Sequence, residues 1–445
     1  MTARILAPDR RQVLAGLGAS LGAPIGAFLG TSAAALLAGG AAPAVTAQLA
    51  LQARQASLAL RPGQPATPIW ELAAVSHIGD VRLKRGDRCE VVFRNDLPVP
   101  LSPAWYGLNG PAAADPLRGR APTAPDAVET SIISISSAGT LLADFRLFED
   151  GLKQPARPLP IIASEASRVA VDRDVILLVE EWRLRPDGIA IPPGREPKDT
   201  SALYTLNGQP SFELSAVAGE RLRLRFINGS QRSVLAIKLE SHEIQVMALD
   251  GQPAEPFPAR NGALVLAPGA RADAFVDATT SASFLLHDGK EARQVGRLKV
   301  SGKIERGPLS PPQPLPSNDL PEKLDLRGAL RFDVALGVPE AGWVRTADFS
   351  TASAPTFRAK AGRTVVLALK NPGAVATVFH LHGHHFRLLD KLDDGWKPYW
   401  LDTLAIEPGQ TQRIAFAATS PGRWLIESVV TDWAAPRLVR WYGVE

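Results

Sequence analysis

Sulfur is nearly absent from this sequence. Cys89 is its single cysteine, and Met247 is its only methionine besides Met1. A lone cysteine excludes an intrachain disulfide, so the fold has to be stabilised by packing. Histidine is also scarce, with seven residues in the whole chain.

Charge is sparse as well. Charged residues make up 21% of the chain, the formal net charge is +4, and no dense run of lysine and arginine occurs. Nucleic-acid binding therefore has little support. Hydrophobic residues make up 45% of the 445 residues, which is enough for a sizeable core and for two to four domains of roughly 100–200 residues each.

Long apolar runs are confined to the N-terminus. Arg10 and Arg11 precede a stretch rich in alanine, glycine and leucine, and small residues end it at 44–47. This pattern resembles a twin-arginine export signal over residues 1–47. A membrane anchor is the alternative, but Pro24 and Pro43 interrupt the stretch. No later run reaches about 18 apolar residues, so no membrane span is expected in the mature chain.

A ten-residue pattern occurs three times, at residues 86–95, 219–228 and 362–371. Each copy begins with glycine, ends with asparagine and alternates apolar with polar residues between them. A period of two predicts a strand with one buried face. The copies are separated by about the length of one β-sandwich domain, roughly 100 residues. The sequence therefore predicts three copies of one structural unit.

The repeat also predicts the role of the cysteine. Cys89 aligns with Leu222 and Val365, so we expect it in the core rather than at a ligand position. Short strands bounded by glycine and proline favour β-sandwiches with Greek-key connections. Proline is frequent near 153–172 and at 305–321, which predicts two linkers. The predicted boundaries are 1–47 for the signal, 48–168, 169–304 and 322–445 for three domains, and 305–321 for a stiff linker.

One segment carries recognisable chemistry. Residues 380–386 read His-Leu-His-Gly-His-His-Phe, and His380 and His382 share one strand face, so both rings could reach one metal ion. The segment resembles the His-x-His-Gly-His-x-Phe strand of the multicopper oxidases, laccase-like proteins in which it supplies two imidazoles to a three-copper cluster. The resemblance covers essentially the whole mature chain. It implies an all-β fold of three cupredoxin-like Greek-key β-sandwich domains.

The same resemblance implies that most copper ligands are missing, because the family set takes more histidines than the seven present. Its four His-x-His pairs come from the first and last domains and meet at their interface. The slots of the first pair hold Ala104 and Tyr106. Those of the second pair hold Asp144 and Arg146.

The blue-copper site lacks its ligands too. The third pair survives, but Thr377 stands in the preceding slot of a blue-copper histidine. The His-Cys-His motif is replaced by Glu-Ser-Val at 427–429, and its trailing histidine and axial methionine slots hold Trp433 and Leu438. The resemblance thus supports the fold more than the activity.

Two interpretations of the surviving histidines stay open. One is a vacated copper-site network of Asp144, Arg146, His380, His382 and Glu427, in which Arg146 supplies the positive charge, since unpaired buried charges are costly. The other is a metal site of two histidines and a carboxylate, a sensible ligand set for iron, zinc or manganese. We expect no cofactor, or copper if any.

The other histidines are interpreted as structural. His384 aligns with His242 across the repeats, which predicts a hairpin role for both. His385 should point to the opposite strand face. His77 and His287 lie near glycine and aspartate turns and are predicted to be surface or capping residues.

The sequence is compatible with three functions. The first is a non-catalytic, exported scaffold or binding protein with an unknown protein partner in the periplasm, which resembles the copper-free SufI/FtsP-type members of the bacterial division machinery. The second is an oxidoreductase that uses copper or another metal at a reduced site, His380 and His382. The third, a copper-handling protein without turnover, is disfavoured because tracts rich in methionine or histidine are absent.

Overall fold

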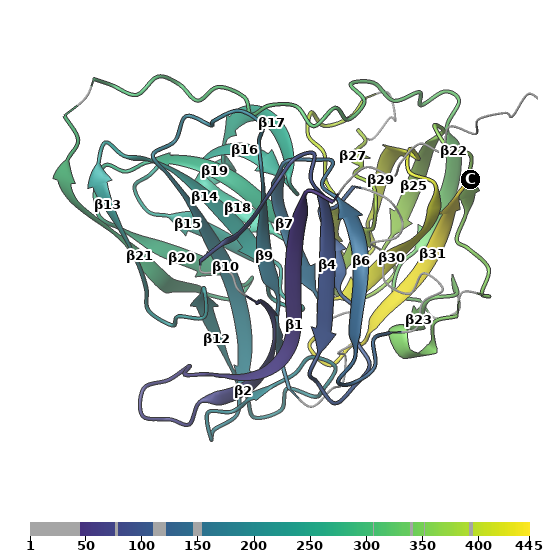
Figure 1. The fold of residues 1–445 in the computed structure, drawn as a ribbon, viewed down its shortest axis with the longest axis horizontal. Helices are drawn as coiled ribbons and strands as arrows, with labels where there is room; N and C mark the ends of the chain where they lie inside the picture. The colour runs from purple at the N-terminus through teal and green to yellow at the C-terminus, as the bar shows by residue number, and fades with distance from the viewer. Residues whose placement is uncertain are drawn as a thin grey trace, which may run out of the picture. The chain divides into compact units, whose positions relative to one another are not determined.

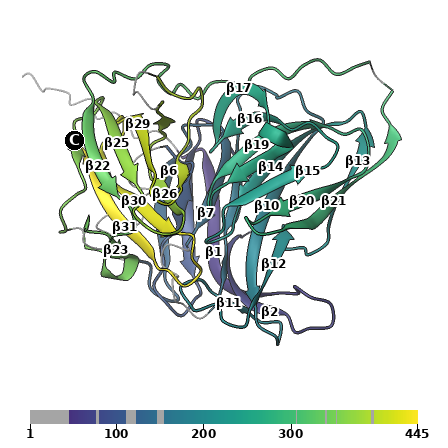
Figure 2. The ribbon, with the colours of Figure 1, turned by 180° about the vertical axis from the view of Figure 1, so that it is seen from behind.

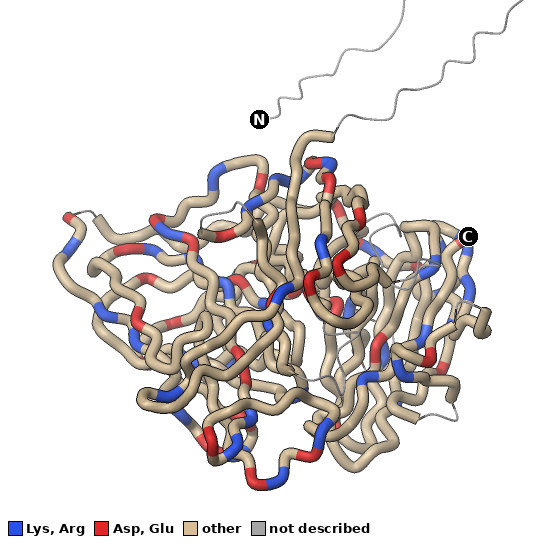
Figure 3. Tube along the Cα trace, turned by 60° about the horizontal axis from the view of Figure 1, so that its bottom comes forward, with Lys and Arg blue, Asp and Glu red and all other residues tan. Residues whose placement is uncertain are grey.

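The computed structural model describes most of the chain after the predicted signal. Residues 1–44 lie outside it, and β1 begins at Ala47, the last residue assigned to the signal. Among the described residues, no helix is both long and apolar enough to cross a membrane. Charges of both signs are interspersed along the described chain, without a long run of one sign (Figure 3). The described ranges are 45–75, 79–109, 122–145, 154–305, 307–338, 341–350, 352–390 and 395–445.

The first sandwich packs a five-stranded sheet against a four-stranded one (Figure 1). Its core contains Cys89, Val91 and Phe93, the alternating residues of the first repeat. The five strands, in spatial order, are β6 (Val128–Ser134), β4 (Arg88–Asn95), β1 (Ala47–Leu58), β2 (Thr67–Ala74) and β8 (Ala156–Arg157). The four strands are β3 (Val81–Lys84), β9 (Leu159–Ser164), β7 (Gly139–Asp144) and β5 (Ala104–Tyr106).

The second sandwich has a sheet of seven strands and a sheet of five, and Figure 2 shows them from behind. The first sheet runs β11 (Ala190–Ile191), β10 (Arg173–Leu184), β14 (Arg221–Asn228), β19 (Arg271–Asp277), β16 (Gln245–Leu249) and β17 (Gln252–Pro258), with β12 (Ser201–Leu206) paired to β10. The other runs β13 (Phe212–Ala218), β21 (Ala292–Lys303), β20 (Ala282–His287), β15 (Leu235–Leu239) and β18 (Ala263–Leu266). A 3₁₀ turn, η3 (Arg260–Gly262), precedes β18.

The third sandwich carries the histidine motif. One sheet runs β22 (Leu330–Ala335), β25 (Thr364–Lys370), β29 (Thr411–Ala417) and β27 (Arg387–Leu388). The other runs β23 (Val344–Arg345), β31 (Arg437–Val444), β30 (Gly422–Val430), β26 (Thr377–Leu381) and β28 (Thr403–Ile406), with β24 (Arg358–Ala359) paired to β31. A second 3₁₀ turn, η5 (Thr346–Asp348), follows β23.

The three repeat strands β4, β14 and β25 occupy equivalent places. Each pairs in parallel with the first long strand of its sandwich and antiparallel with a later one. Cys89, Leu222 and Val365 are fully buried at matching positions. The all-β sandwich fold and the core position of Cys89 are thereby confirmed.

The asparagine that ends each repeat strand has a physical role. Asn95, Asn228 and Asn371 are fully buried. In each case the side-chain amide donates to two backbone carbonyls, and the side-chain oxygen accepts the N–H of the residue two positions on. A buried turn whose backbone groups are satisfied by one side chain explains why the same residue recurs three times.

The predicted linkers turn out differently. Residues 305–321 contain no strand where they are described, but they are held in place. Asn318 is buried, donates to the carbonyl oxygens of Ala138 and Gly251, and accepts the N–H of Ala138. The linker prediction for 153–172 was wrong in part, because β8 and β9 form there. Pro160 sits near the start of β9, where a missing N–H is tolerated.

The burial of Cys89 generates a prediction about its reactivity. Burial, with a smaller contribution from the Asp87 carboxylate, raises the pKa of the Cys89 thiol to about 11. The thiolate is the reactive form, so the native protein should not react with a disulfide reagent such as Ellman's reagent at pH 8. Unfolding in urea should release one reactive thiol per chain. Rapid reaction without denaturant would contradict the core assignment.

Candidate functional site

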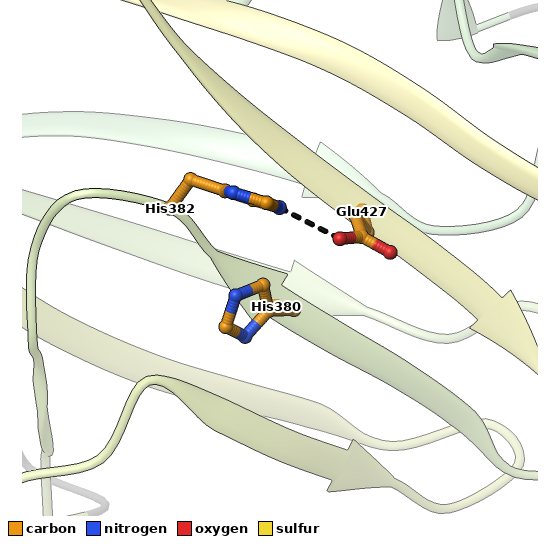
Figure 4. A group of neighbouring side chains, drawn as sticks. All are labelled: His380, His382 and Glu427. Atoms are coloured by element: carbon orange, nitrogen blue, oxygen red, sulfur yellow. Dashed lines mark hydrogen bonds and ion pairs between the residues drawn. The ribbon is translucent and has the colours of Figure 1, made fainter. Parts of the chain in front are cut away.

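The surviving histidine pair lies where the first and third sandwiches meet. Ala104 of β5 packs against Leu425 on β30 and against Val439 and Trp441 on β31. His380 and His382 come from β26 and the residue just beyond it, next to β30 (Figure 4). The two imidazole rings are 4.6 Å apart and nearly perpendicular, and both side chains are buried.

Glu427 is the centre of this cluster. It is the Cα partner of His380 in the β26–β30 ladder and is fully buried. Its Oε1 is 2.6 Å from Nε2 of His382, and its Oε2 is 2.5 Å from Nη1 of Arg437. The Tyr106 hydroxyl on β5 donates to the same carboxylate at 3.2 Å.

These contacts determine the charge of Glu427. Burial alone would raise the pKa of this carboxyl, but the Arg437 guanidinium and the His382 hydrogen bond outweigh it and hold the pKa below its usual range. The carboxylate is therefore ionised and can only accept. It follows that His382 carries a proton on Nε2 and donates it to Glu427.

His380 differs from His382 in the ring nitrogen that carries the proton. Its Nδ1 is 2.8 Å from Oγ1 of Thr403, and that hydroxyl donates its only proton to Asp402 at 2.8 Å. Nδ1 must therefore carry a proton that it donates to Thr403, since burial lowers the pKa of His380 to about 3 and keeps the ring neutral. Its Nε2 is then an unprotonated nitrogen, buried and without a hydrogen-bond partner among the described residues. The ring of Tyr106 packs on this imidazole at 4.2 Å.

Behind His380 lies a second buried charge network. Arg271 of β19 binds Asp402 through two hydrogen bonds of 3.0 and 2.7 Å. Asp250 accepts the backbone N–H groups of Arg271, Asp402 and Thr403. Burial and the Asp402 carboxylate raise the pKa of Asp250 to about 7. Burial also opposes ionisation of Asp402, but Arg271 outweighs it and lowers its pKa.

The glycine of the motif allows this packing. Gly383 has φ of +75°, and a side chain there would overlap the ring of Trp424. Next to it, His384 donates from Nδ1 to the Tyr442 hydroxyl at 2.7 Å, because that hydroxyl's proton goes to the carbonyl of His382. Its Nε2 accepts the N–H of Ser420.

The other histidines fit their structural interpretation where they are described. His242 accepts the N–H of Thr279 through Nε2, as its counterpart His384 does with Ser420. His385 contacts Asn109 and the carbonyl of Asp250, away from the Glu427 cluster. His287 is exposed and its Nδ1 accepts the N–H of Gly289 in a turn. The predicted surface residue His77 lies outside the described residues.

Known proteins resemble this chain in both sequence and fold. Two models of the multicopper oxidase family match residues 175–299 and 323–445, together more than half of the chain. MmcO, a multicopper oxidase of Mycobacterium tuberculosis, is 24% identical over 409 residues, 78% of this chain and 77% of its own length. A multicopper oxidase structure from Pseudomonas thermotolerans matches with a TM-score of 0.77 and 25% identity, over 90% of this chain and all of that one. Lac15, from a marine microbial metagenome, gives a TM-score of 0.72 and 25% identity over 89% of this chain and all of its own.

This chain belongs to the multicopper oxidase family. The copper sites of that family can therefore be tested against the residues that stand here. In the three-copper region, Tyr106 fills the space beside His380, and Arg437 places a fixed positive charge on Glu427. A guanidinium beside the carboxylate opposes a cluster of cations, so the donor set does not fit three coppers.

The blue-copper site does not fit either. Ser428 occupies the cysteine slot, and Thr377 hydrogen-bonds to Asn371. Trp433 donates its indole N–H to the carbonyl of Pro192 in the second sandwich, and Leu438 belongs to the third core. No thiolate is available, because the only cysteine is buried in the first core.

A single metal ion is the remaining possibility. One atom each from His380, His382 and Glu427 lie within 4.8 Å of one another, and these are the only such group among the described residues. His380 offers a free nitrogen, but His382 would have to lose the proton it gives to Glu427. Arg437 would also remain next to the bound ion.

The predicted network is placed only in part. Asp144 is buried on β7 opposite Ala104, and Arg146 lies outside the described residues. Three participants were missed: Arg437 as the cation beside Glu427, and Arg271 with Asp402 behind His380. The sequence offered one clue to Arg437, because it is adjacent to Leu438, the residue at the family's axial methionine position. Nothing in the spacing of Arg271 and Asp402 pointed to their contact.

A double-mutant cycle tests the Glu427–Arg437 pair. Arg437→Met should destabilise the fold by about 3–5 kcal/mol, because it leaves a buried carboxylate without its cation. Adding Glu427→Gln should recover part of that loss, since the amide oxygen still accepts from His382. Urea unfolding gives the free energies. The control is Arg345→Met, which breaks an exposed pair with Asp348 and should cost less than about 1 kcal/mol. Equal losses in both variants would contradict this account of the cluster.

The buried imidazoles predict a pH dependence of stability. Burial lowers the pKa of His380 and His384 to about 3, and it lowers that of His385 too. Below the ordinary pKa of 6.5 only the unfolded chain binds these protons, so the free energy of unfolding should fall as pH drops from 7.5 to 5. Asp250 and Glu181 act in the opposite sense, because burial raises the pKa of each carboxyl, but they are two groups against three.

Urea unfolding across this pH range measures the effect. His384→Gln should flatten the slope, and His287→Gln, at an exposed position, should leave it unchanged. A free energy of unfolding that rises toward pH 5 would show that these imidazoles are protonated in the native protein.

Proposed function

We propose that this protein is a non-catalytic member of the multicopper oxidase family that acts as a scaffold or binding protein. One observation carries the proposal. Glu427, in the slot of a copper-ligating histidine, is bonded to His382, to the hydroxyl of Tyr106 and to the guanidinium of Arg437. Protein groups thus supply the positive charge and the polar contacts that copper ions provide in the family.

The lost thiolate supports the same conclusion. A blue copper needs a cysteine ligand to accept electrons from a substrate, and Ser428 offers only a hydroxyl. Without an entry point for electrons, a reaction that delivers four of them to oxygen cannot begin. This chain retains the three packed sandwiches of the family fold, and their surface can bind another molecule.

The export signal extends the proposal to a compartment. An exported, copper-free member of this family with a protein partner in the periplasm would resemble SufI/FtsP-type proteins. The twin-arginine pattern at residues 1–47 supports export, and the missing ligands support the likeness.

An alternative rests on a specific observation. His380 has a buried Nε2 with a free lone pair, and its other nitrogen is oriented by Thr403 and Asp402. Metal-binding imidazoles commonly donate their other ring N–H to an oxygen acceptor that fixes the orientation of the ring. An oxidoreductase with one metal ion at His380, His382 and Glu427 is therefore the second candidate.

Metal loading separates the two candidates. The mature protein should contain no stoichiometric copper, iron, zinc or manganese by mass spectrometry of the metals, and EDTA should leave its melting temperature unchanged. After incubation with copper it should show no intense blue absorption band and no laccase-like oxidation of phenols.

The matched variants are His380→Gln and His287→Gln. If chelation lowers the melting temperature, one metal restores it, and only His380→Gln abolishes that response, the oxidoreductase replaces the scaffold. A blue band in the copper-treated protein would overturn the ligand assignment itself.

A further inference from the structure

We propose that a cleft between the second and third sandwiches binds a small organic anion with an apolar, ring-containing body. The cleft has a volume of about 410 Å³, within the range of roughly 300–1,000 Å³ that is usual for ligand sites. Its lining contains neither Glu427 nor a residue of the blue-copper positions, although Asp250, Arg271 and Thr403 of the network behind His380 form part of its wall. Its principal apolar lining is Val246, Phe257, Leu264, Tyr399, Leu404 and Ala405.

Both sandwiches contribute apolar walls. Phe257 on β17 and Tyr399 before β28 face each other with ring centroids 6.3 Å apart and ring planes 28° from parallel. Val265 on β18 also lines the cleft and is 70% exposed, the most exposed of the large hydrophobic side chains among the described residues. An apolar surface that is open at the rim and lined by rings favours a planar apolar ligand.

The charge of the ligand follows from the three charged residues that line the cleft, which are Asp250, Arg260 and Arg271. Asp250 and Arg271 are buried and satisfy each other and the neighbouring backbone. Arg260, on the exposed turn η3, has no ion pair and no side-chain hydrogen bond within the described chain. One uncommitted guanidinium beside an apolar cavity matches one carboxylate or sulfonate on an apolar body.

The cleft adjoins the buried network behind His380. Thr403 lines the cleft and also accepts the Nδ1 proton of His380. A ligand bound here would bury Val265 and Tyr399 and hold the second sandwich against β28. Binding should therefore raise the melting temperature of the whole protein.

A pair of fluorescent dyes tests the proposal on the mature protein. The anionic probe is 1-anilinonaphthalene-8-sulfonate, and the neutral control is N-phenyl-1-naphthylamine, which has the same ring system without the sulfonate. We expect saturable binding of the anion at one site and an increased melting temperature. Arg260→Gln should weaken the anion about tenfold and leave the neutral dye unchanged. Arg297→Gln, an exposed arginine on β21, is the matched control and should change neither.

Filling the cavity is the second arm. Ala405→Phe should abolish the binding of both dyes, and Ala263→Phe serves the same purpose if the first variant does not fold. Near-ultraviolet circular dichroism confirms that each variant is native. The proposal is overturned if native protein binds neither dye saturably, if the filled variants bind as wild type does, or if Arg260→Gln weakens both dyes equally.

Discussion

A single buried cation, Arg271, connects all three sandwiches. It donates to Asp402 in the third, to the carbonyls of Asp250 and Gly269 in its own, and to the carbonyl of Thr140 in the first. A guanidinium taken fully out of water is costly unless every donor is satisfied. The three sandwiches can therefore pack only in the arrangement that brings these acceptors together, and the position of the histidine cluster depends on it.

Under the proposed function, the Glu427 cluster takes the place of the copper ions that the family binds here. Two imidazoles and a carboxylate buried at an interface would repel or remain unsatisfied if their metal ions were simply removed. Arg437 supplies the positive charge, and the ring of Tyr106 fills the volume beside His380. Arg437 also reaches Gln231 in the second sandwich, so the replacement strengthens the same junction that Arg271 forms. The free Nε2 of His380 is the one polar atom of the motif that this replacement does not satisfy.

Much of the fold was predictable because strand patterns are local. The alternation in 86–95 and its two copies identified buried strands, and the terminal asparagine marked the turns. The segment 153–172 was misjudged because proline composition indicates a linker, whereas Pro160 stands at a strand position that needs no N–H. The site was predicted only where a family motif aligned it. His382 and Glu427 were expected in one cluster, but Arg437, Arg271 and Asp402 were not.

The sequence by itself determined the number of units, the identity of the core residues and the absence of a copper thiolate, since these depend on residue type and spacing along one strand. Only the tertiary structure decided which charges neutralise each other. The partners of Glu427 come from β5, from the residue just after β26 and from β31, and those of Arg271 come from three different sandwiches. Electrostatic pairing depends on distance in space, and the order of residues along the chain does not indicate which distant charges will meet.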